Sequence, residues 1–256
     1  CPDIPAVYVD TGLEYPELRD FVKTKDNVIW LLPRYPYTQI LEKYGYPVIS
    51  KDISDVISGA RKGQPYRLAR LNGESLDKNG KKSIYNCEKY KYLLDAPFAI
   101  SARCCYYMKK APLNKFERQS GRHPITGVLA CESKLREQSY LKFGCNGYER
   151  RRPLSQPLAF WREEDILRYL RMTGIPYTPI YGDIGEVKKR NGALTLKTTG
   201  VSRSGCMYCM YGVHLEHEPN RFQLMEKTHP QQYHYCIHEL GLGAVLDYIG
   251  VPYSCR

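Results

Sequence analysis

The alternation of strands and helices near the start of the chain places the strongest limit on its fold. Residues 5–10, PAVYVD, form a short apolar run that is typical of a buried strand. ELRDFVKTK (17–25) then has helical spacing, NVIWLLP (27–33) predicts a second strand, and YTQILEKYG (37–45) predicts a helix that ends at Gly45. Such alternation is typical of parallel βαβ units. We therefore expect an α/β fold with a doubly wound parallel sheet.

The middle of the chain continues this pattern, and its end does not. PITGVLA (124–130) predicts another buried strand, and ESKLREQSYLKFG (132–144) predicts the helix that follows it. A further amphipathic helix is predicted to end at Gly174. Loop-forming residues dominate after about residue 183. We expect one α/β domain over residues 1–182 and a loop-rich C-terminal extension over residues 183–256.

Ten cysteines stand in a chain that contains nothing like a signal peptide and no apolar run long enough to span a bilayer. We therefore expect a cytoplasmic protein that makes no use of membranes. In such a protein, clustered cysteines indicate metal or redox chemistry rather than disulfides. Several scattered cysteines are expected to be ordinary buried thiols; the scattered ones are Cys1, Cys87, Cys131, Cys145 and Cys236.

Two tight cysteine pairs are the candidate ligands of one metal site. Cys206 and Cys209 form a C-x-x-C, and Cys104-Cys105, at the start of a helix expected to break at Pro112, is the only other close pair. Together they offer four thiolates, enough for a tetrahedral zinc or a 4Fe–4S cluster. Zinc sites generally use two spaced knuckles, so adjacent cysteines argue mildly against zinc. A dithiol redox pair and unrelated core thiols remain alternatives.

The formal net charge of +11 predicts a polyanionic partner; of a nucleotide, a nucleic acid and a membrane surface, we expect one of the first two. Arg150, Arg151 and Arg152 form the densest basic run, in ERRRP. Consecutive arginines can hold phosphate or sulfate through paired hydrogen bonds. The alternative is a solvent-facing turn with no ligand.

Two further segments are candidate nucleotide contacts. Asp10, Thr11 and Gly12 follow the first predicted strand, where the carboxyl ends of parallel strands meet ligands, although they would equally suit a helix cap. The second segment lies beside the predicted strand at 124–130, where the free N–H groups of a helix start attract anionic oxygens. Its candidate residues are Gly127, Glu132, Ser133 and Arg136.

Four blocks of the sequence resemble the phosphoadenosine phosphosulfate (PAPS) reductase family of the adenine-nucleotide α-hydrolase (PP-loop) superfamily. VDTGLEYPE (9–17) is similar to a family strand end, and CCYYMKKAPL (104–113) resembles the cysteine block of the iron–sulfur branch, the adenylylsulfate reductases. TGVLACESKLREQS (126–139) and PLAFWREEDILRYL (157–170) resemble two later blocks. The C-x-x-C falls where that branch carries its second cysteine pair. The matches span residues 5–212.

The resemblance implies a PP-loop fold with a 4Fe–4S cluster on Cys104, Cys105, Cys206 and Cys209. An adenine nucleotide is the implied substrate, near Asp10–Gly12 and Gly127. In the reductases a cysteine attacks the sulfur of a sulfonucleotide, and thioredoxin then releases sulfite. Lys109 and the arginines at 150–152 would neutralise the sulfate or phosphate oxygens. We also expect a homo-oligomer.

Three departures from the family pattern bear on the reaction. The Ser-Gly-Gly-Lys-Asp-Ser phosphate loop has no equivalent, and we expect it, with the first strand, to precede Cys1. Leu129 stands where the family carries an arginine. The reductases' Glu-Cys-Gly-x-His nucleophile motif is missing, which leaves Cys255, in the unrelated context PYSCR, as the candidate nucleophile.

These observations support three functions. The first is an iron–sulfur sulfonucleotide reductase of sulfur metabolism. The alternative is an ATP-dependent PP-loop sulfurtransferase acting on DNA or tRNA, which the net charge, Leu129 and the missing nucleophile motif favour. The third is a nucleotide- or iron–sulfur-binding module without catalysis.

Overall fold

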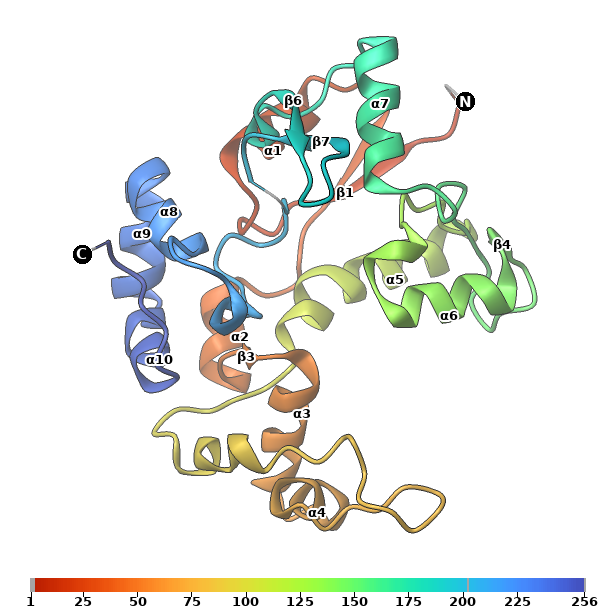
Figure 1. The fold of residues 1–256 in the computed structure, drawn as a ribbon. Helices are drawn as coiled ribbons and strands as arrows, with labels where there is room; N and C mark the ends of the chain where they lie inside the picture. The colour runs from red at the N-terminus through yellow and green to blue at the C-terminus, as the bar shows by residue number, and fades with distance from the viewer. Residues whose placement is uncertain (1–2, 202, 256) are drawn as a thin grey trace. The chain divides into compact units, whose positions relative to one another are not determined.

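The first four predicted elements are present in the computed structural model, which describes residues 3–201 and 203–255 (Figure 1). They are β1 (Ala6–Val9), α1 (Pro16–Lys23), β2 (Val28–Leu31) and α2 (Tyr37–Tyr44). Ala6 N donates to Asn27 O at 3.0 Å, and Asp10 N donates to Leu31 O at 2.9 Å. Both residue numbers increase from the first bond to the second, so β1 and β2 run parallel. The predicted alternation of strand and helix is therefore confirmed.

Gly45 ends α2 in a conformation that other residues rarely adopt, with φ 93°. A Cβ at this position would lie 2.2 Å from the backbone of Ala99. The chain then runs beside that segment through a parallel bridge between Tyr46 and Ile100. Glycine is thus required both by the turn and by the close approach of two backbone segments.

The strands form small two-stranded sheets in place of the continuous doubly wound sheet expected from the sequence. In the part of the chain that the structure describes, β1 pairs with β2, β3 (Val48–Ile49) pairs in parallel with β8 (Met210–Tyr211), β4 (Asn146–Gly147) pairs with β5 (Leu154–Ser155), and β6 (Ile184–Lys188) pairs with β7 (Leu194–Thr198). The fold is mixed α/β with small sheets: β1–β2 and β3–β8 are parallel, and β4–β5 and β6–β7 are antiparallel.

Residues 124–130 form a single parallel bridge, Ile125 to Ser155, where a full strand was expected. Pro124, which lacks an N–H, limits pairing on the N-terminal side of this bridge, and a 3₁₀ turn at Ala130–Glu132 ends the extended run. Ile125 remains 57% exposed. The apolar composition of this segment therefore reflects neither a buried nor a regular strand.

The contacts of the chain separate two compact units whose segments interleave in sequence. Within the described residues, the first unit comprises 3–8, 14–29, 113–201 and 203–204. The second unit comprises 9–13, 30–112 and 205–255. A boundary between residues 182 and 183 stays a prediction.

The second unit holds the larger core. Its helices include α3 (Lys51–Ala60) and α4 (Pro65–Asn72), and the Ser50 side chain caps α3 by accepting from Ile53 N at 3.1 Å. The largest fully buried side chains all lie in this unit; they are Ile40, Val48, Val56, Ile57, Leu71, Leu93, Met108, Met210, Val213, Phe222, Leu242 and Leu246.

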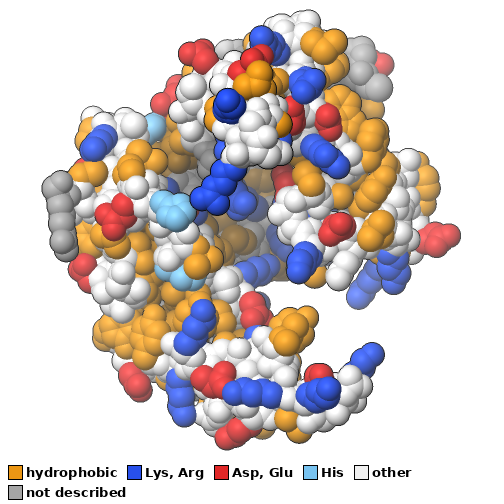
Figure 2. Space-filling model, viewed as in Figure 1, with side chains coloured by type: hydrophobic (Ala, Val, Ile, Leu, Met, Phe, Trp, Pro, Cys, Tyr) orange, Lys and Arg blue, Asp and Glu red, His pale blue; other side chains and the backbone are white. Residues whose placement is uncertain are grey.

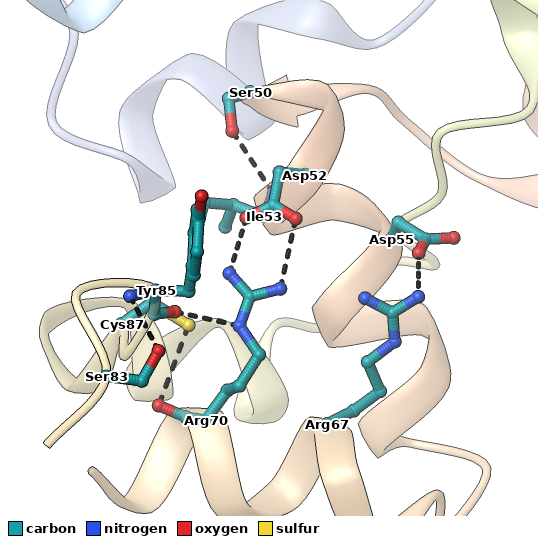
Figure 3. A network of polar contacts seen from close by, with 9 residues as sticks. All are labelled: Ser50, Asp52, Ile53, Asp55, Arg67, Arg70, Ser83, Tyr85 and Cys87. Carbon is teal, nitrogen blue, oxygen red and sulfur yellow. Dashed lines mark hydrogen bonds and ion pairs between the residues drawn. The ribbon is translucent and has the colours of Figure 1, made fainter. Parts of the chain in front are cut away.

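Arg70 fastens α4 to α3 within the second unit (Figure 3). Its guanidinium donates to both carboxylate oxygens of Asp52, at 3.0 and 2.6 Å, and its Nε donates to the Tyr85 carbonyl at 2.8 Å. The Arg70 side chain is only 5% exposed, whereas that of Asp52 is 58% exposed. The buried cation is therefore compensated by one carboxylate and one carbonyl.

The first unit contains α1 and most of the central helices. These are α5 (Ala111–Ser120), which starts in the second unit, α6 (Lys134–Phe143) and α7 (Glu163–Thr173). The predicted helices at 132–144 and before Gly174 are thus present. Gly174 follows α7 with φ 63°, which is the left-handed conformation expected of a glycine that ends a helix.

The C-terminal part, expected to be rich in loops, contains regular structure. The hairpin β6–β7 is followed by α8 (Arg221–Thr228), α9 (Pro230–His234) and α10 (Leu242–Tyr248), which lie next to one another in Figure 1. Asn220 caps α8 through its side chain and Gln223 returns a bond to Asn220 N, a reciprocal cap with Asn in place of Ser or Thr. No helix in the described ranges is both long and apolar enough to cross a membrane.

Candidate functional site

The first cysteine pair opens the helical segment that leads into α5. The Sγ atoms of Cys104 and Cys105 lie 3.9 Å apart. A π-helical turn, Tyr106–Lys110, follows at once, and Ala111 N donates to Tyr106 O across five residues. The wide turn precedes Pro112, which has no N–H and whose ring would crowd a regular α-helical turn. The helix is widened at the proline rather than broken there.

The C-x-x-C forms a tight turn before β8. Cys209 N donates to Cys206 O at 3.2 Å, and the two residues between the cysteines, Met207 and Tyr208, are buried. Met207 N also donates to the Leu13 carbonyl at 2.8 Å. This bond ties the cysteine turn to the loop that follows β1, and all of these residues lie in the second unit.

The charges of both cysteine pairs act on Tyr37. Its side chain is 7% exposed at the start of α2. Burial raises the pKa of the Tyr37 hydroxyl well above its ordinary value, and the charges of Cys104, Cys209, Cys206 and Cys105 raise it further. All four thiols are therefore within electrostatic range of one buried phenol, although about a hundred residues separate the pairs.

The thiols differ in how readily they ionise. A hydrogen bond from Cys104 lowers the pKa of Cys105, and the positive charges of Lys51, Lys109 and Lys110 lower it further. Burial raises the pKa of the Cys209 thiol. A thiolate at Cys105 beside three lysines is the form that binds metals.

A buried hydroxyl lies beside the thiols. The Tyr211 hydroxyl oxygen is buried and has no hydrogen-bond partner in the described part of the chain. Burial and then the charge of Cys104 raise its pKa, and Ser54 offsets part of that rise. The Ser54 hydroxyl itself accepts from Val48 N and donates to Val48 O. A buried hydroxyl that the charges of Cys104, Cys105 and Cys209 reach is a polar neighbour for a group bound by these thiols.

The donor set fits a thiolate-bound metal group. No cysteine among the described residues forms a disulfide. Within the same residues, no three His, Cys, Asp or Glu side chains are already arranged as a metal site. Four thiols in two pairs are the ligand set that iron–sulfur clusters and structural zinc use. Their chemistry fits such a group, while its identity is a matter for proposal.

The Asp10–Gly12 segment lies in the same unit as the thiols. Gly12 N donates to Asp10 Oδ1 at 3.3 Å, and Leu13 N donates to Thr11 Oγ1 at 3.2 Å. These side chains fix their own loop, and the alternative of a cap on α1 does not hold, because Tyr15 occupies that cap without a side-chain bond. The loop presents its backbone beside the cysteine turn through Leu13.

The candidate residues around α6 lie in the first unit. Ser133 is the N-cap of α6 and accepts from Arg136 N at 3.3 Å. Glu132 and Arg136 form an ion pair. Gly127 lies in an extended segment, where a Cβ would meet only Leu158 Cδ1, at 3.8 Å. The helix start is therefore already capped by Ser133.

The arginine run is largely engaged within the first unit. Arg150 lies 4.3 Å from the Phe143 ring centroid and donates to the Ser139 hydroxyl. Arg152 pairs with Glu117. Arg151 is exposed and forms no ion pair in residues that the structure describes. Of the three, Arg151 is thus the one whose guanidinium is not committed to a protein contact.

Lys109 and Cys255 have different surroundings in the second unit. Lys109 is half-buried in the π-helical turn, and its charge lowers the pKa of Cys105 and opposes the rise in that of Cys209. Cys255 is anchored: its N–H donates to Glu226 Oε2 at 2.7 Å and its thiol to the Gln223 carbonyl at 3.6 Å. The candidate nucleophile is therefore held by the α8 segment.

The remaining cysteines vary in exposure. Cys87 and Cys236 are buried, as expected of core thiols, whereas Cys145 is half-buried and Cys131 is exposed. Cys1 lies outside the described residues. Tyr37 and Tyr211, by contrast, had no signal in the sequence, because the chain has 23 tyrosines and neither follows a recognisable pattern.

Comparison with known proteins identifies the family of the chain. The family model of the phosphoadenosine phosphosulfate reductase domain matches residues 35–211, a range that includes both cysteine pairs and α2. The comparison with curated proteins finds no match. Because the family model covers more than half of the chain, the protein belongs to the phosphoadenosine phosphosulfate reductase domain family.

Proposed function

We propose that the protein is a sulfonucleotide reductase-like iron–sulfur enzyme that acts on adenylylsulfate or phosphoadenylylsulfate. One observation carries the proposal: two cysteine pairs distant in sequence both act electrostatically on the buried Tyr37, inside the range matched by the family model. Unrelated core thiols would not be expected to share one buried neighbour in this way. The proposal deepens the family assignment, which by itself indicates sulfur chemistry on a nucleotide.

The four thiolates of Cys104, Cys105, Cys206 and Cys209 would hold a 4Fe–4S cluster. When bound, the cluster would supply one-electron redox capacity. The Tyr211 hydroxyl and the Lys109 ammonium, both in the same unit, would surround it with a neutral donor and a positive charge. Outer groups of this kind orient thiolate ligands and tune the bound group.

In the second unit the nucleotide would bind through the loop Asp10–Gly12. In the first unit Gly127, Glu132, Ser133 and Arg136 are candidate contacts for an anionic group. Lys109 in the second unit and the arginines at 150–152 in the first are each candidates to neutralise sulfate or phosphate oxygens. Arg151 is the strongest of these three, since it is exposed and forms no ion pair in the described residues. Arg150 and Arg152 would first have to leave Ser139 and Glu117.

The reaction would proceed in two steps. A cysteine thiolate attacks the sulfur atom, an S–S bond forms, the S–O bond to the nucleotide phosphate breaks, and AMP or its 3′-phosphate leaves. A thioredoxin-like dithiol then attacks the cysteine sulfur, is oxidised to a disulfide, and releases sulfite. Cys255 is the candidate nucleophile, and its tail would have to release the Glu226 and Gln223 contacts to reach substrate.

The test is sulfite release by the full-length protein, purified without oxygen and supplied with each sulfonucleotide, thioredoxin and thioredoxin reductase. We expect wild-type protein and Cys131→Ser to release sulfite and Cys255→Ser to release none. Cys131 is the matched control because its thiol is exposed and lies outside the proposed site. No sulfite from either nucleotide, with the cluster intact, would overturn the reductase assignment.

A second candidate function is an ATP-dependent sulfurtransferase that acts on DNA or tRNA. Two observations favour it: Cys255 is anchored rather than free, and Leu129, which replaces the family arginine, is only 8% exposed and offers no charge to a substrate. This candidate predicts ATP–pyrophosphate exchange and sulfur-containing nucleosides in nucleic acid recovered from cells that express the protein. Sulfite release without ATP–pyrophosphate exchange and without sulfur-containing nucleosides would favour the reductase over the sulfurtransferase.

A further inference from the structure

Four tyrosines and three cations form a patch on the second unit that the proposed reaction does not use. One part comes from the loop before α2 and from α2 itself, and the other from the segment that contains the first cysteine pair. We call this set the tyrosine–cation patch; its members are Arg34, Tyr35, Lys43, Tyr44, Arg103, Tyr106 and Tyr107.

The rings are held in fixed relative positions. Tyr44 and Tyr107 stack with centroids 4.7 Å apart and planes 15° apart, and their hydroxyls share a hydrogen bond of 2.8 Å. Tyr35 and Tyr106 meet the Tyr107 ring edge-on, at 6.4 and 5.2 Å. Because the rings order one another, a ligand that stacked on them would pay little further side-chain entropy.

Cations surround these rings. The Arg34 guanidinium lies 5.1 Å from the Tyr35 centroid, and the Lys43 ammonium lies 5.9 Å from Tyr35 and 5.6 Å from Tyr44. The positive charges of Arg103 and Lys43 act on the Tyr107 hydroxyl. Arg34, Lys43 and Arg103 form no ion pair with any carboxylate of the described residues, and all three are exposed.

The patch faces solvent rather than forming a core. Tyr106 is 44% exposed, and Tyr35, Tyr44 and Tyr107 are half-buried. Figure 2 shows that Lys and Arg side chains are spread over the face of the molecule drawn there. A cluster that served packing alone would be expected to cover its rings and to pair its charges.

We propose that the tyrosine–cation patch binds single-stranded nucleic acid, with an unpaired base stacked on Tyr106 and phosphates along Arg34, Lys43 and Arg103. An aromatic platform beside several unpaired cations is the arrangement that binds single strands without reading sequence. Three separate cations suit successive phosphates spaced along a strand, whereas AMP offers one phosphate and ATP a single compact triphosphate. The net charge of +11 favours the same class of partner.

This proposal does not depend on which reaction the protein catalyses. The candidate contacts for the adenine nucleotide, at Asp10–Gly12, are different residues from those of the patch. A protein that reduces a sulfonucleotide and a protein that transfers sulfur to nucleic acid could each carry this surface. Binding is therefore measured without cofactor, substrate or ATP.

The test is fluorescence anisotropy of the full-length protein with a labelled oligo(dT) of about 12 nucleotides, at several salt concentrations. We expect Tyr106→Ala to weaken binding about tenfold, since stacking contributes about 1–3 kcal/mol per base. Tyr106→Phe should bind as wild type does, because stacking needs the ring and not the hydroxyl. Tyr66→Ala is the matched control, since Tyr66 is 59% exposed in the same unit but lies outside the patch.

The cations give an independent readout. Each of Arg34→Ala and Lys43→Ala should reduce the slope of log affinity against log salt by about 0.7, as expected for one phosphate contact on a single strand. Lys78→Ala, which removes an exposed charge away from the patch, should leave the slope unchanged. Melting curves of each variant establish that the fold is kept.

Three results would overturn the proposal. Equal binding by Tyr106→Ala and Tyr66→Ala would show that the patch is not used. Binding of duplex DNA as tight as that of the single strand would contradict base stacking. Binding of AMP or ATP at the patch, with no binding of the oligonucleotide, would assign these residues to a mononucleotide site.

Discussion

The two compact units differ in how much side chain they bury. The second unit contains every side chain among the largest fully buried ones, and a buried arginine, Arg70, bonded on three sides. In the first unit, the buried apolar side chains among the described residues are Leu129, Ala159, Leu167 and Leu196, and its ion pairs lie largely at the surface.

The difference follows the division of the candidate site. All four thiols and the Asp10–Gly12 loop belong to the unit with the larger core, where packing can hold ligands in place without a bound partner. The candidate anion contacts around α6 and the arginine run belong to the unit with little core. We therefore expect the thiol site to be pre-organised by the fold, and the anion contacts to be more adaptable.

Matched leucine substitutions test this comparison most strongly. Leu246 is fully buried in the second unit, and Leu167 is 6% exposed in the first. Leu246→Ala should cost close to the upper end of the range of about 2–5 kcal/mol seen for buried leucines, because a dense core cannot collapse onto the cavity. Leu167→Ala should fall near the lower end. Hydrogen exchange at increasing urea concentrations measures the free energy of unfolding of each variant. Equal losses of stability in the two variants would contradict the difference between the units.

Arginine substitutions test the same contrast for charges. Arg70→Met leaves the Tyr85 carbonyl and Asp52 without their partner, and should lower the free energy of unfolding by about 1.5–3 kcal/mol. Arg171→Met in the first unit removes an exposed pair with Glu186 and should cost about 0–1 kcal/mol. Chemical denaturation of the two variants makes the comparison. A larger loss for Arg171→Met would show that surface pairs hold the first unit together.

The smallest expected effect on stability comes from a histidine in the second unit, and it depends on pH. Burial, and then Lys89, lowers the pKa of His214 below its ordinary value of 6.5, and its Nδ1 is buried without a hydrogen-bond partner in the described residues. As the pH falls through 6.5 the unfolded chain takes up a proton first, so stability decreases until the folded state is also protonated.

We therefore expect the stability of the wild-type protein to fall between about pH 7 and pH 5, and that of His214→Asn to fall less. Thermal unfolding across this range measures the slope for each protein. His217→Asn is the matched control, since His217 is exposed nearby in the chain. Equal slopes for wild type and His214→Asn would remove the proposed effect of burial.

Individual helices and strands could be predicted from the sequence where the spacing of apolar residues agrees with the position of a helix-ending glycine. The elements from β1 to α2 were predicted because apolar runs alternate with helical spacing and Gly45 marks a stop. The arrangement of strands could not be predicted, because pairing such as that of β3 with β8 joins residues far apart in sequence. Residues 124–130 misled for another reason: the segment is apolar, but it pairs only at Ile125 and runs into a 3₁₀ turn at Ala130.

The candidate site shows the same limit. The spacing of the cysteines indicated two pairs, but only the fold shows that Tyr37 lies within range of both. The tyrosine–cation patch had no signal at all, because Tyr35, Tyr44 and Tyr107 come together only when α2 meets the segment after the first cysteine pair. The order of residues likewise did not indicate that Arg150 and Arg152 would pair within their own unit.

The central claim is that four thiols of the second unit hold one iron–sulfur cluster, and metal analysis tests it most directly. Wild-type protein, Cys104→Ser, Cys206→Ser and Cys131→Ser are purified without oxygen and assayed for iron, acid-labile sulfide and zinc, with Mössbauer spectra of the iron-loaded samples. We predict about four iron and four sulfide per chain in wild type and Cys131→Ser, and a loss of both in Cys104→Ser and Cys206→Ser. Stoichiometric zinc in place of iron, or an equal loss of iron in Cys131→Ser, would contradict the account.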